Sequence, residues 1–492
     1  MMTPTLWHWS SLLLAMPEAF LALSGLVLLV IGAFMKRESS GIMCWAVVLM
    51  FAVTMYILLN MDWDQARAFS DHFIMDRFSG YMKLLVLIGL SGSLMLSTRY
   101  LAQENMARFE YPILVLLAGV GMMVMLSANS FLSLYVGLEL QSLSLYVLAA
   151  IRRDHVRASE ADLKYFVLGA LSSGMLLYGI SLIYGYTGAI GFDAVGRSIL
   201  EAQNAGILSP GAVIGMVFIL VGIAFKVSAV PFHMWSPDVY EGAPTSVTAL
   251  FAIVPKVAAM GLLLRVLYDP FAAMMPDWQQ VIWVLSAASM GFAAFAGLVQ
   301  KNIKRLMAYS SIGNVGYAMM GIVAGTSEGA GAVVLYITIY MMMTAATFGI
   351  IMLMRRNDRM VESVYDLAGL SKNSPALAYA MAIMMFSMSG IPPLAGFFGK
   401  LLVFQAAIES GFYTLAVFGV LTSVVAAYYY LRVIKVMFFD EAADPFDQQP
   451  AFVRKVVVAF CTLFVLTFVF VPDTLVQTSR AAVLVLFTTS GG

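Results

Sequence analysis

The sequence predicts an all-α polytopic protein, a chain of helices that crosses a membrane many times. It has 492 residues, of which 61% are hydrophobic and only 11% are charged. This composition is far more apolar than that of a soluble domain. Apolar runs of roughly 18–25 residues recur along the whole length, and each is long enough to cross a bilayer as a helix. The formal net charge is zero, and the absence of long basic or acidic runs argues against nucleic acid as a partner.

Hydropathy predicts about fourteen transmembrane helices along the chain. The first expected span is too long for the core of a signal peptide and follows no basic residue, so we expect it to be retained. The expected spans are 12–34, 42–60, 79–99, 111–127, 130–151, 161–185, 211–232, 246–267, 278–299, 305–325, 330–354, 375–408, 412–438 and 452–471.

Two of these spans contain residues that break helices, and they occupy similar places in the two halves of the chain. Pro231 follows Lys226 in the first, and Pro392 and Pro393 precede Lys400 in the second. Proline removes a backbone donor, so a continuous helix is not expected at either place. Interrupted helices at corresponding positions are typical of transporters built from inverted repeats. We therefore divide the chain into N-terminal helices at 1–110, repeats at 111–270 and 277–440, and a C-terminal loop and helix at 441–492.

Four ionisable residues lie inside otherwise apolar spans: Glu139, Lys226, Lys256 and Lys400. Each would cost about 2.5–3.5 kcal/mol near the middle of a bilayer, or roughly 10–14 kcal/mol for all four without compensation. Membrane proteins that keep such residues usually use them to move an ion or a proton. The alternative is structural: Glu139 as an ion-pair partner, and the lysines reaching an interface along their aliphatic stems.

Four further ionisable residues allow two interpretations. Lys164 and Lys83 lie near span ends, where a structural role is favoured, and Arg265 has the position of an interfacial anchor. His233 follows the break at Pro231, where it either relays protons near neutral pH or holds a turn.

The sequence contains no visible cofactor site. It has no Gly-rich phosphate loop, no cysteine cluster and no pair of histidines at ligand spacing, the patterns that would indicate a nucleotide, flavin, iron–sulfur cluster, haem or metal. Cys44 and Cys461 lie far apart in hydrophobic segments and are expected to be small buried apolar residues. We therefore expect any redox chemistry to reside in other chains.

The basic residues of the short loops predict the orientation in the membrane. One set of alternate loops is rich in them and should be cytoplasmic, which places both termini on the outer side. The rich set holds Lys36, Arg37, Arg108, Arg152, Arg153, Arg157, Lys301, Lys304, Arg305, Arg355, Arg356, Arg359, Lys372, Arg454 and Lys455, and the opposite set holds Arg67, Arg77 and Arg197.

The segment from Ala229 to Thr245, AVPFHMWSPDVYEGAPT, resembles the signature of the antiporter-like membrane subunits of respiratory complex I. The resemblance extends over essentially the whole chain. It implies a fourteen-helix fold with two inverted-topology five-helix repeats, each containing a broken helix. By this resemblance the glutamate of the family's fifth helix and the lysines of its sixth, seventh, eighth and twelfth helices fall on Glu139, Lys164, Lys226, Lys256 and Lys400.

The resemblance also implies a function. A subunit of this family couples NADH-to-quinone electron transfer to proton pumping in the bacterial inner membrane. It has no redox centre of its own, because FMN, the iron–sulfur clusters, NADH and quinone belong to partner subunits. Its partners are the other membrane-arm subunits, including neighbouring antiporter-like ones. Two alternatives stay open: a subunit of a multi-subunit cation/proton antiporter, and a scaffold protein with structural charges. The ending from Asp238 to Gly242 favours complex I.

A buried lysine and a mobile carboxylate are sufficient to drive such a pump. Burial weakens the hold of a lysine on its proton, and an approaching carboxylate strengthens it. A swing of about three pKa units is worth roughly 4 kcal/mol. Moving one charge across about 150–180 mV requires roughly 3.5–4 kcal/mol. The hypothesis is that Lys226 loads from the cytoplasm, Lys256 passes the proton on, Lys400 releases it outward, and Glu139 sets the timing.

Overall fold

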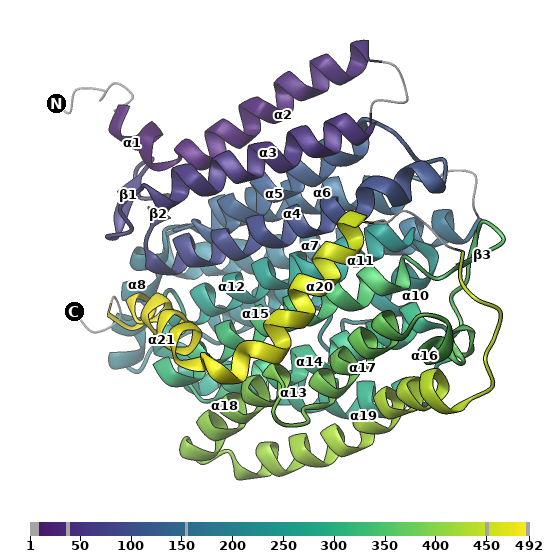
Figure 1. Ribbon diagram of the computed structural model, residues 1–492. Helices are drawn as coiled ribbons and strands as arrows, with labels where there is room; N and C mark the ends of the chain where they lie inside the picture. Colours follow the sequence, from purple (N-terminus) through teal and green to yellow (C-terminus); the bar gives the residue numbers. More distant parts are fainter. Residues whose placement is uncertain (1–8, 36–39, 153–155, 448–451, 489–492) are drawn as a thin grey trace.

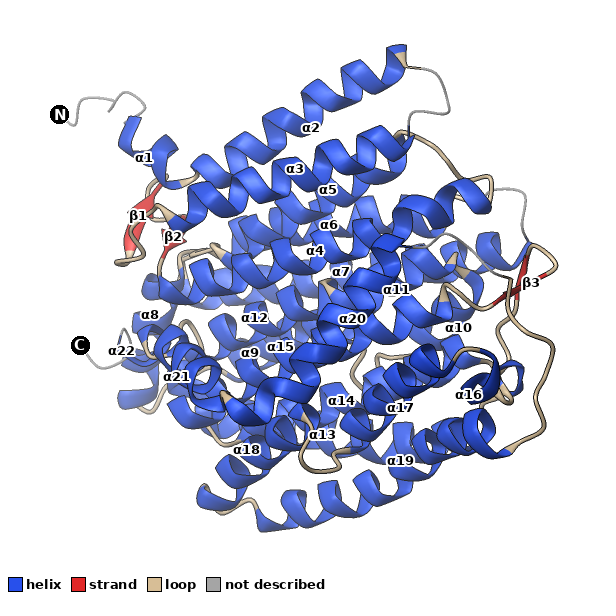
Figure 2. Cartoon of the chain, viewed as in Figure 1, coloured by secondary structure: helices blue, strands red, loops and turns tan. Residues whose placement is uncertain are grey.

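The computed structural model describes residues 9–35, 40–152, 156–447 and 452–488. Most of these residues are helical, and the long helices lie roughly alongside one another (Figure 1). Helices α2 (Met16–Phe34) and α3 (Ser40–Leu59) lie at one edge, and α18 (Ala395–Glu409) and α19 (Tyr413–Phe439) lie at the opposite edge. In the described part of the chain, strands are confined to two short antiparallel hairpins (Figure 2).

The remaining elements up to residue 268 include the first interrupted helix. They are α1 (Trp9–Leu14), β1 (Ala66–Ala68), β2 (Phe73–Met75), α4 (Arg77–Gln103), α5 (Glu110–Leu126), α6 (Phe131–Ala149), α7 (Val156–Thr187), α8 (Phe192–Asn204), α9 (Pro210–Val227), α10 (Trp235–Gly242), α11 (Thr245–Ile253) and α12 (Pro255–Tyr268).

The elements after residue 268 include the second interrupted helix and a C-terminal helical arm. They are η2 (Ala272–Met274), α13 (Met275–Leu298), α14 (Ile303–Val323), α15 (Ser327–Ile351), β3 (Arg355–Arg356), β4 (Arg359–Met360), η3 (Val364–Leu367), α16 (Leu370–Asn373), α17 (Pro375–Ser389), α20 (Phe452–Thr467), η4 (Phe468–Phe470), α21 (Pro472–Val483) and α22 (Val485–Thr488).

The predicted all-helical membrane fold is confirmed. Within the described residues, 12 helices are long and apolar enough to cross a membrane. Two shorter apolar helices, α5 and α17, coincide with expected spans, the second with only the first part of 375–408. The count of fourteen, the four-part division of the chain and the inverted relation of the repeats remain predictions.

The centre of the bundle is formed by α11, α12, α14 and α15. Their most apolar windows are 94–100% buried, whereas those of α2 and α20 are only 28% buried and face outward. A polar side chain on a central helix is therefore screened from lipid by other helices, which is where membrane proteins keep functional charges.

The first predicted break lies between α9 and α10. Ser228 ends α9 in the left-handed conformation, with φ of 63°. The peptide between Val230 and Pro231 is cis. The backbone N–H of Val230 donates to the hydroxyl of Ser289 on α13 at 2.9 Å, so the neighbouring half satisfies a group that the break leaves free.

The second break lies between α17 and α18. Gly390 ends α17 with φ of 89°, a conformation that glycine adopts without steric cost. The peptide between Pro392 and Pro393 is cis. A Cβ atom at Gly396 would lie 2.0 Å from the carbonyl oxygen of Ser387, so the close return of the chain requires glycine there.

The expected span at 246–267 is found as a candidate membrane span from Thr245 to Tyr268, with a one-residue interruption at Val254. Helix α11 ends at Ile253 and α12 begins at Pro255, which lacks the N–H that would continue the hydrogen-bond ladder. This interruption places Lys256 in the first turn of a new helix.

Candidate functional site

Lys226 lies at the end of α9, and its side chain crosses to α6. It is 8% exposed. Its Nζ atom donates to the hydroxyl of Ser142 at 2.7 Å and to that of Tyr146 at 3.5 Å. In the described part of the chain Glu139 forms no ion pair with Lys226, and its Oε1 atom has no hydrogen-bond partner. The structure therefore shows Lys226 held by hydroxyls on the helix that carries Glu139.

Lys256 occupies the centre of the bundle. It is 4% exposed, and its Nζ atom donates to the hydroxyl of Ser311 on α14. The ring centroid of Tyr240 lies 5.6 Å from the same nitrogen, within the range of a cation–π interaction. Lys256 is therefore bound by two uncharged groups, the Ser311 hydroxyl and the Tyr240 ring, which come from two other helices.

Lys400 lies in α18, just beyond the second break. Its Nζ atom donates to the carbonyl oxygen of Ser389 at 3.1 Å and to the hydroxyl of Ser423 at 2.8 Å. The carbonyl is one that the end of α17 leaves free, so the lysine itself satisfies a group exposed by the break. The Tyr317 ring centroid lies 4.6 Å from Nζ.

A polar network that the sequence-based expectations did not include lies beside Lys256 and Lys400. The Tyr336 hydroxyl donates to Oδ1 of Asn314 at 2.6 Å, and the hydroxyls of Ser310 and Tyr430 lie 2.6 Å apart. A usable signal was present, because the polar residues of α14 repeat at helical spacing and therefore share a face. These residues are Ser310, Ser311, Asn314 and Tyr317.

Two further residues, Lys164 and His233, were expected to take part in the relay. Both are less buried than the three central lysines. Lys164 has a side chain that is 41% exposed and forms ion pairs with Glu160 and Asp238, both at 2.8 Å. His233 is partly buried in the break and packs its ring against Phe292, with centroids 4.6 Å apart.

The position of Arg265 in the sequence predicted an interfacial anchor, but this prediction is wrong. Arg265 is part of a buried ion pair. Its guanidinium donates to both carboxylate oxygens of Asp76, at 2.6 and 2.9 Å. Lys83 is likewise fully buried and lies 2.6 Å from the carboxylate of Glu18. Both pairs join residues far apart in the sequence, which explains why local position did not reveal them.

The segment that carries the family resemblance connects three helices at one end of the bundle. Asp238 on α10 forms ion pairs with Lys164 on α7 and with Arg305 on α14, the second at 2.9 Å. Glu241 also pairs with Arg305 at 2.9 Å. The second half of the first broken helix is thereby fixed to both halves of the chain.

The described residues contain no group of three or more His, Cys, Asp or Glu side chains arranged to hold a metal ion. The expectation that this chain carries no cofactor remains a prediction.

Two interrupted helices and a set of buried lysines in the bundle interior define a membrane protein of the proton-antiporter class. Residues 128–426 match the family described as NADH:quinone oxidoreductase/Mrp antiporter, transmembrane. A relative from Rhodospirillum rubrum, NADH-quinone oxidoreductase subunit N, is 54% identical over 470 residues, covering 95% of this chain and 96% of the relative. The chain belongs to the NADH-quinone oxidoreductase subunit N family, the antiporter-like membrane subunits of complex I.

Solved structures agree with this assignment. A chain of respiratory complex I from Thermus thermophilus with bound aureothin is 33% identical, with a TM-score of 0.79 over 94% of this chain and 98% of that one. A chain of the Mrp complex from Dietzia sp. DQ12-45-1b has a TM-score of 0.84 over 97% of this chain and 98% of that one, at 20% identity. The second likeness shows the fold alone, so sequence identity favours complex I over the cation/proton antiporter alternative.

Proposed function

We propose that this subunit moves protons through a relay formed by Glu139, Lys226, Lys256 and Lys400. One observation carries the proposal. In the described part of the chain, the three lysines have hydroxyls, a carbonyl and aromatic rings as partners and no carboxylate within ion-pair distance. Lys83 and Arg265, two buried cations to which we assign a structural role, are each paired with a carboxylate.

A lysine bound only by hydroxyls is suited to gaining and losing a proton. A neutral amine can accept a hydrogen bond from the same hydroxyl to which the ammonium donates, so neither protonation state leaves a buried group unpaired. A carboxylate partner would favour the charged state and oppose release. In this proposal Lys226 takes up a proton, Lys256 passes it on, Lys400 releases it, and Glu139 regulates Lys226. Lys164 and His233 are further relay candidates.

The proposed setting is complex I of the bacterial inner membrane. Assembly of related chains in respiratory complex I supports other membrane-arm subunits, including antiporter-like ones, as the partners. FMN, the iron–sulfur clusters, NADH and quinone would then be bound by partner subunits, and this chain would contribute the proton path.

The proposed orientation places the basic loops in the cytoplasm and both termini in the periplasm. The positions of the elements support it: β1, α8 and α21 lie at one end of the bundle, and the hairpin β3–β4 lies at the other (Figure 1). Lys36, Arg37 and Arg153 lie outside the described residues. Reporter tags in the 355–374 and 439–451 loops should locate to the cytoplasm and tags at the termini to the periplasm. Cytoplasmic termini would reverse the orientation.

The relay is tested with Glu139→Gln, which keeps the size of the side chain but removes its charge. The complex should still pass electrons from NADH to an artificial acceptor, while NADH–quinone turnover and the proton gradient fall together. Glu139→Asp, which keeps the charge with a shorter reach, should retain part of the activity. Loss of acceptor activity with disassembly would make Glu139 structural, and normal pumping would refute the regulation by charge.

A further inference from the structure

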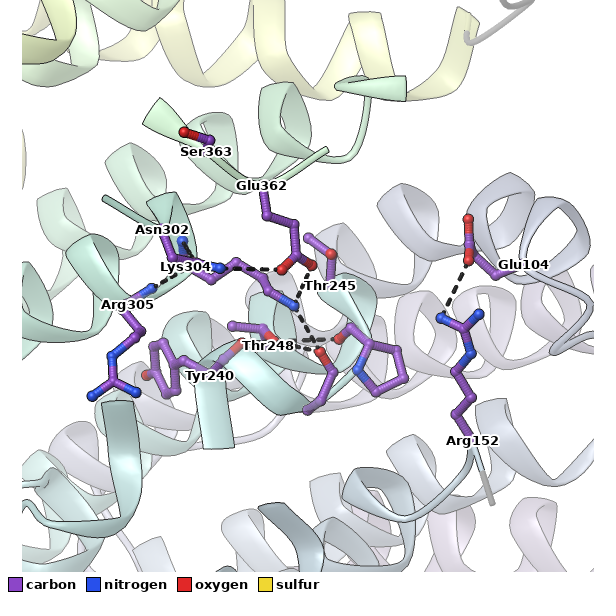
Figure 3. Close-up of polar contacts among 12 residues, drawn as sticks. Glu104, Arg152, Tyr240, Thr245, Thr248, Asn302, Lys304, Arg305, Glu362 and Ser363 are labelled. Carbon is purple, nitrogen blue, oxygen red and sulfur yellow. Dashed lines mark hydrogen bonds and ion pairs between the residues drawn. The ribbon is translucent and has the colours of Figure 1, made fainter. Parts of the chain in front are cut away.

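A charged cavity of about 550 Å³ opens at the end of the bundle that carries the basic loops. It lies between the end of α4, the α10–α11 connection, the start of α14 and the segment that follows β4 (Figure 3). Its wall contains acidic and basic side chains in similar numbers. A polar space of this size holds at least about ten waters, so the cavity brings water to the ends of the central helices.

The floor of this cavity is an ion pair between Lys304 and Glu362. Lys304 is 2% exposed, and its Nζ atom lies 2.6 Å from Oε1 of Glu362. Oε2 of Glu362 accepts a hydrogen bond from the Asn302 side chain at 3.2 Å, and the glutamate side chain remains 26% exposed. The carboxylate therefore faces the water, whereas the ammonium lies behind it.

The ammonium of Lys304 has a second partner in the backbone of the α10–α11 connection. Its Nζ atom also donates to the carbonyl oxygen of Ala243 at 3.1 Å. The hydroxyl of Thr248 lies 3.4 Å from the same carbonyl oxygen (Figure 3). One lysine therefore contacts both a water-facing carboxylate and a carbonyl oxygen that a buried hydroxyl also approaches.

Hydroxyl groups continue from this point towards Lys256. Those of Tyr240, Tyr340 and Thr344 are buried and have no hydrogen-bond partner among the described residues. Ser311 in turn binds Lys256. Seven residues of α14 separate Lys304 from Ser311, a rise of about 10 Å. Unpaired buried hydroxyls over such a distance are suitable partners for bridging waters.

We propose that Lys304 and Glu362 form a proton-uptake gate that gives Lys256 its own supply of protons from the cavity water. A proton from water binds the Glu362 carboxylate and dissolves the ion pair. The Lys304 ammonium then donates a proton to the hydroxyl and water chain that ends at Lys256, and neutral Lys304 takes the proton from the Glu362 carboxylic acid. One proton has moved from the cavity to the interior, and the ion pair is restored. The proposal rests on the proposed function, because it assumes that Lys256 is a relay.

The opposing interpretation is that the ion pair only fixes the start of α14 in the structure. The variant Lys304→Arg distinguishes this structural role from a proton gate. Arginine keeps the charge and can bind Glu362, but it does not release its proton. A structural pair tolerates this change, whereas a gate does not. Lys301→Arg is the matched control, because Lys301 lines the same cavity and is exposed.

The test measures NADH–quinone turnover and proton translocation by the intact complex in membrane vesicles, with electron transfer to an artificial acceptor as the check of assembly. Lys304→Arg should lower turnover and pumping together by at least about tenfold, while Lys301→Arg leaves both unchanged. Equal losses in the two variants would overturn the gate, because they would reflect the shape of the cavity.

Lys256→Arg distinguishes the gate from the relay. Normal pumping by Lys304→Arg with failure of Lys256→Arg would overturn the gate and leave the relay in place. Normal pumping by both would overturn both. If Lys304→Arg does not assemble, Glu362→Gln, which removes the water-facing proton acceptor, decides the question by the same criterion.

Discussion

Lys226 donates a hydrogen bond to Ser142 at 2.7 Å, and Ser142 lies one helical turn from Glu139 on α6. The serine hydroxyl in turn donates to the carbonyl oxygen of Leu138 at 2.6 Å, which fixes its orientation as an acceptor for the ammonium. The lysine is therefore held beside the glutamate without being paired with it. A short movement of the ammonium along one face of α6 would exchange the hydroxyl for the carboxylate, which makes Ser142 the group that competes with Glu139 for the charge.

Ser142→Ala should impair coupling. A hydrogen bond to a charged group contributes about 1.5–3 kcal/mol, and alanine removes the acceptor without adding another. We expect proton-coupled NADH–quinone turnover to fall roughly tenfold, while electron transfer to an artificial acceptor stays normal. Ser142→Thr, which keeps the hydroxyl, should retain most of the activity. If Ala and Thr behave alike, the hydroxyl has no part in holding Lys226.

Lys256→Arg should fail as badly as Lys256→Ala. Arginine remains protonated and cannot pass a proton on, although it preserves the charge near Ser311 and Tyr240. The measurement is proton translocation by the assembled complex, compared between the two variants. A lysine with a purely structural role would accept arginine better than alanine, and normal pumping by the arginine variant would remove Lys256 from the pathway.

Asp76→Asn should destabilise the subunit. Asparagine can still cap α4, but it leaves the Arg265 guanidinium buried without a counter-charge, and loss of one partner of a buried pair costs about 3–5 kcal/mol. The temperature at which the subunit is lost from the detergent-solubilised complex should fall. The double variant Asp76→Asn with Arg265→Gln should recover part of the loss, and a single variant as stable as the parent would show that the pair is unimportant.

Asp269 should make stability depend on pH. It lies in the loop after α12, where burial raises its pKa to about 6, partly offset by Arg265. Because the folded-state pKa lies above the unfolded value of about 3.9, its contribution to stability is fully present below pH about 4 and is lost as pH rises through about 6. Asp269→Asn should therefore raise the thermal dissociation temperature relative to the parent at pH 7.5, with about half that difference at pH 5.

Asp71→Asn is the control for this pH dependence, because Asp71 lines the same surface cavity as Asp269 and is exposed. The difference in thermal dissociation temperature between Asp71→Asn and the parent should be the same at pH 5 and at pH 7.5. An equal gain for both variants would indicate a general effect of net charge instead of the burial of Asp269.

The sequence by itself determined the class of fold and the presence of charges within apolar spans. Apolar runs long enough to cross a bilayer predict spans from local composition alone, and prolines such as Pro231 and Pro393 predict interruptions because they lack a backbone donor. The sequence also places Lys226, Lys256 and Lys400 inside apolar spans, although it leaves open whether their stems reach an interface.

Only the tertiary structure decided which groups these charges meet. Arg265 and Asp76 are separated by 189 residues, and neither the pair nor the partnership of Lys304 with Glu362 has a local signal. Hydropathy fixes whether a helix enters the membrane, but apolar helices are similar on all sides and do not specify their neighbours. The hydroxyls that hold the lysines, and the cavity that brings water towards Lys256, arise from how the helices pack.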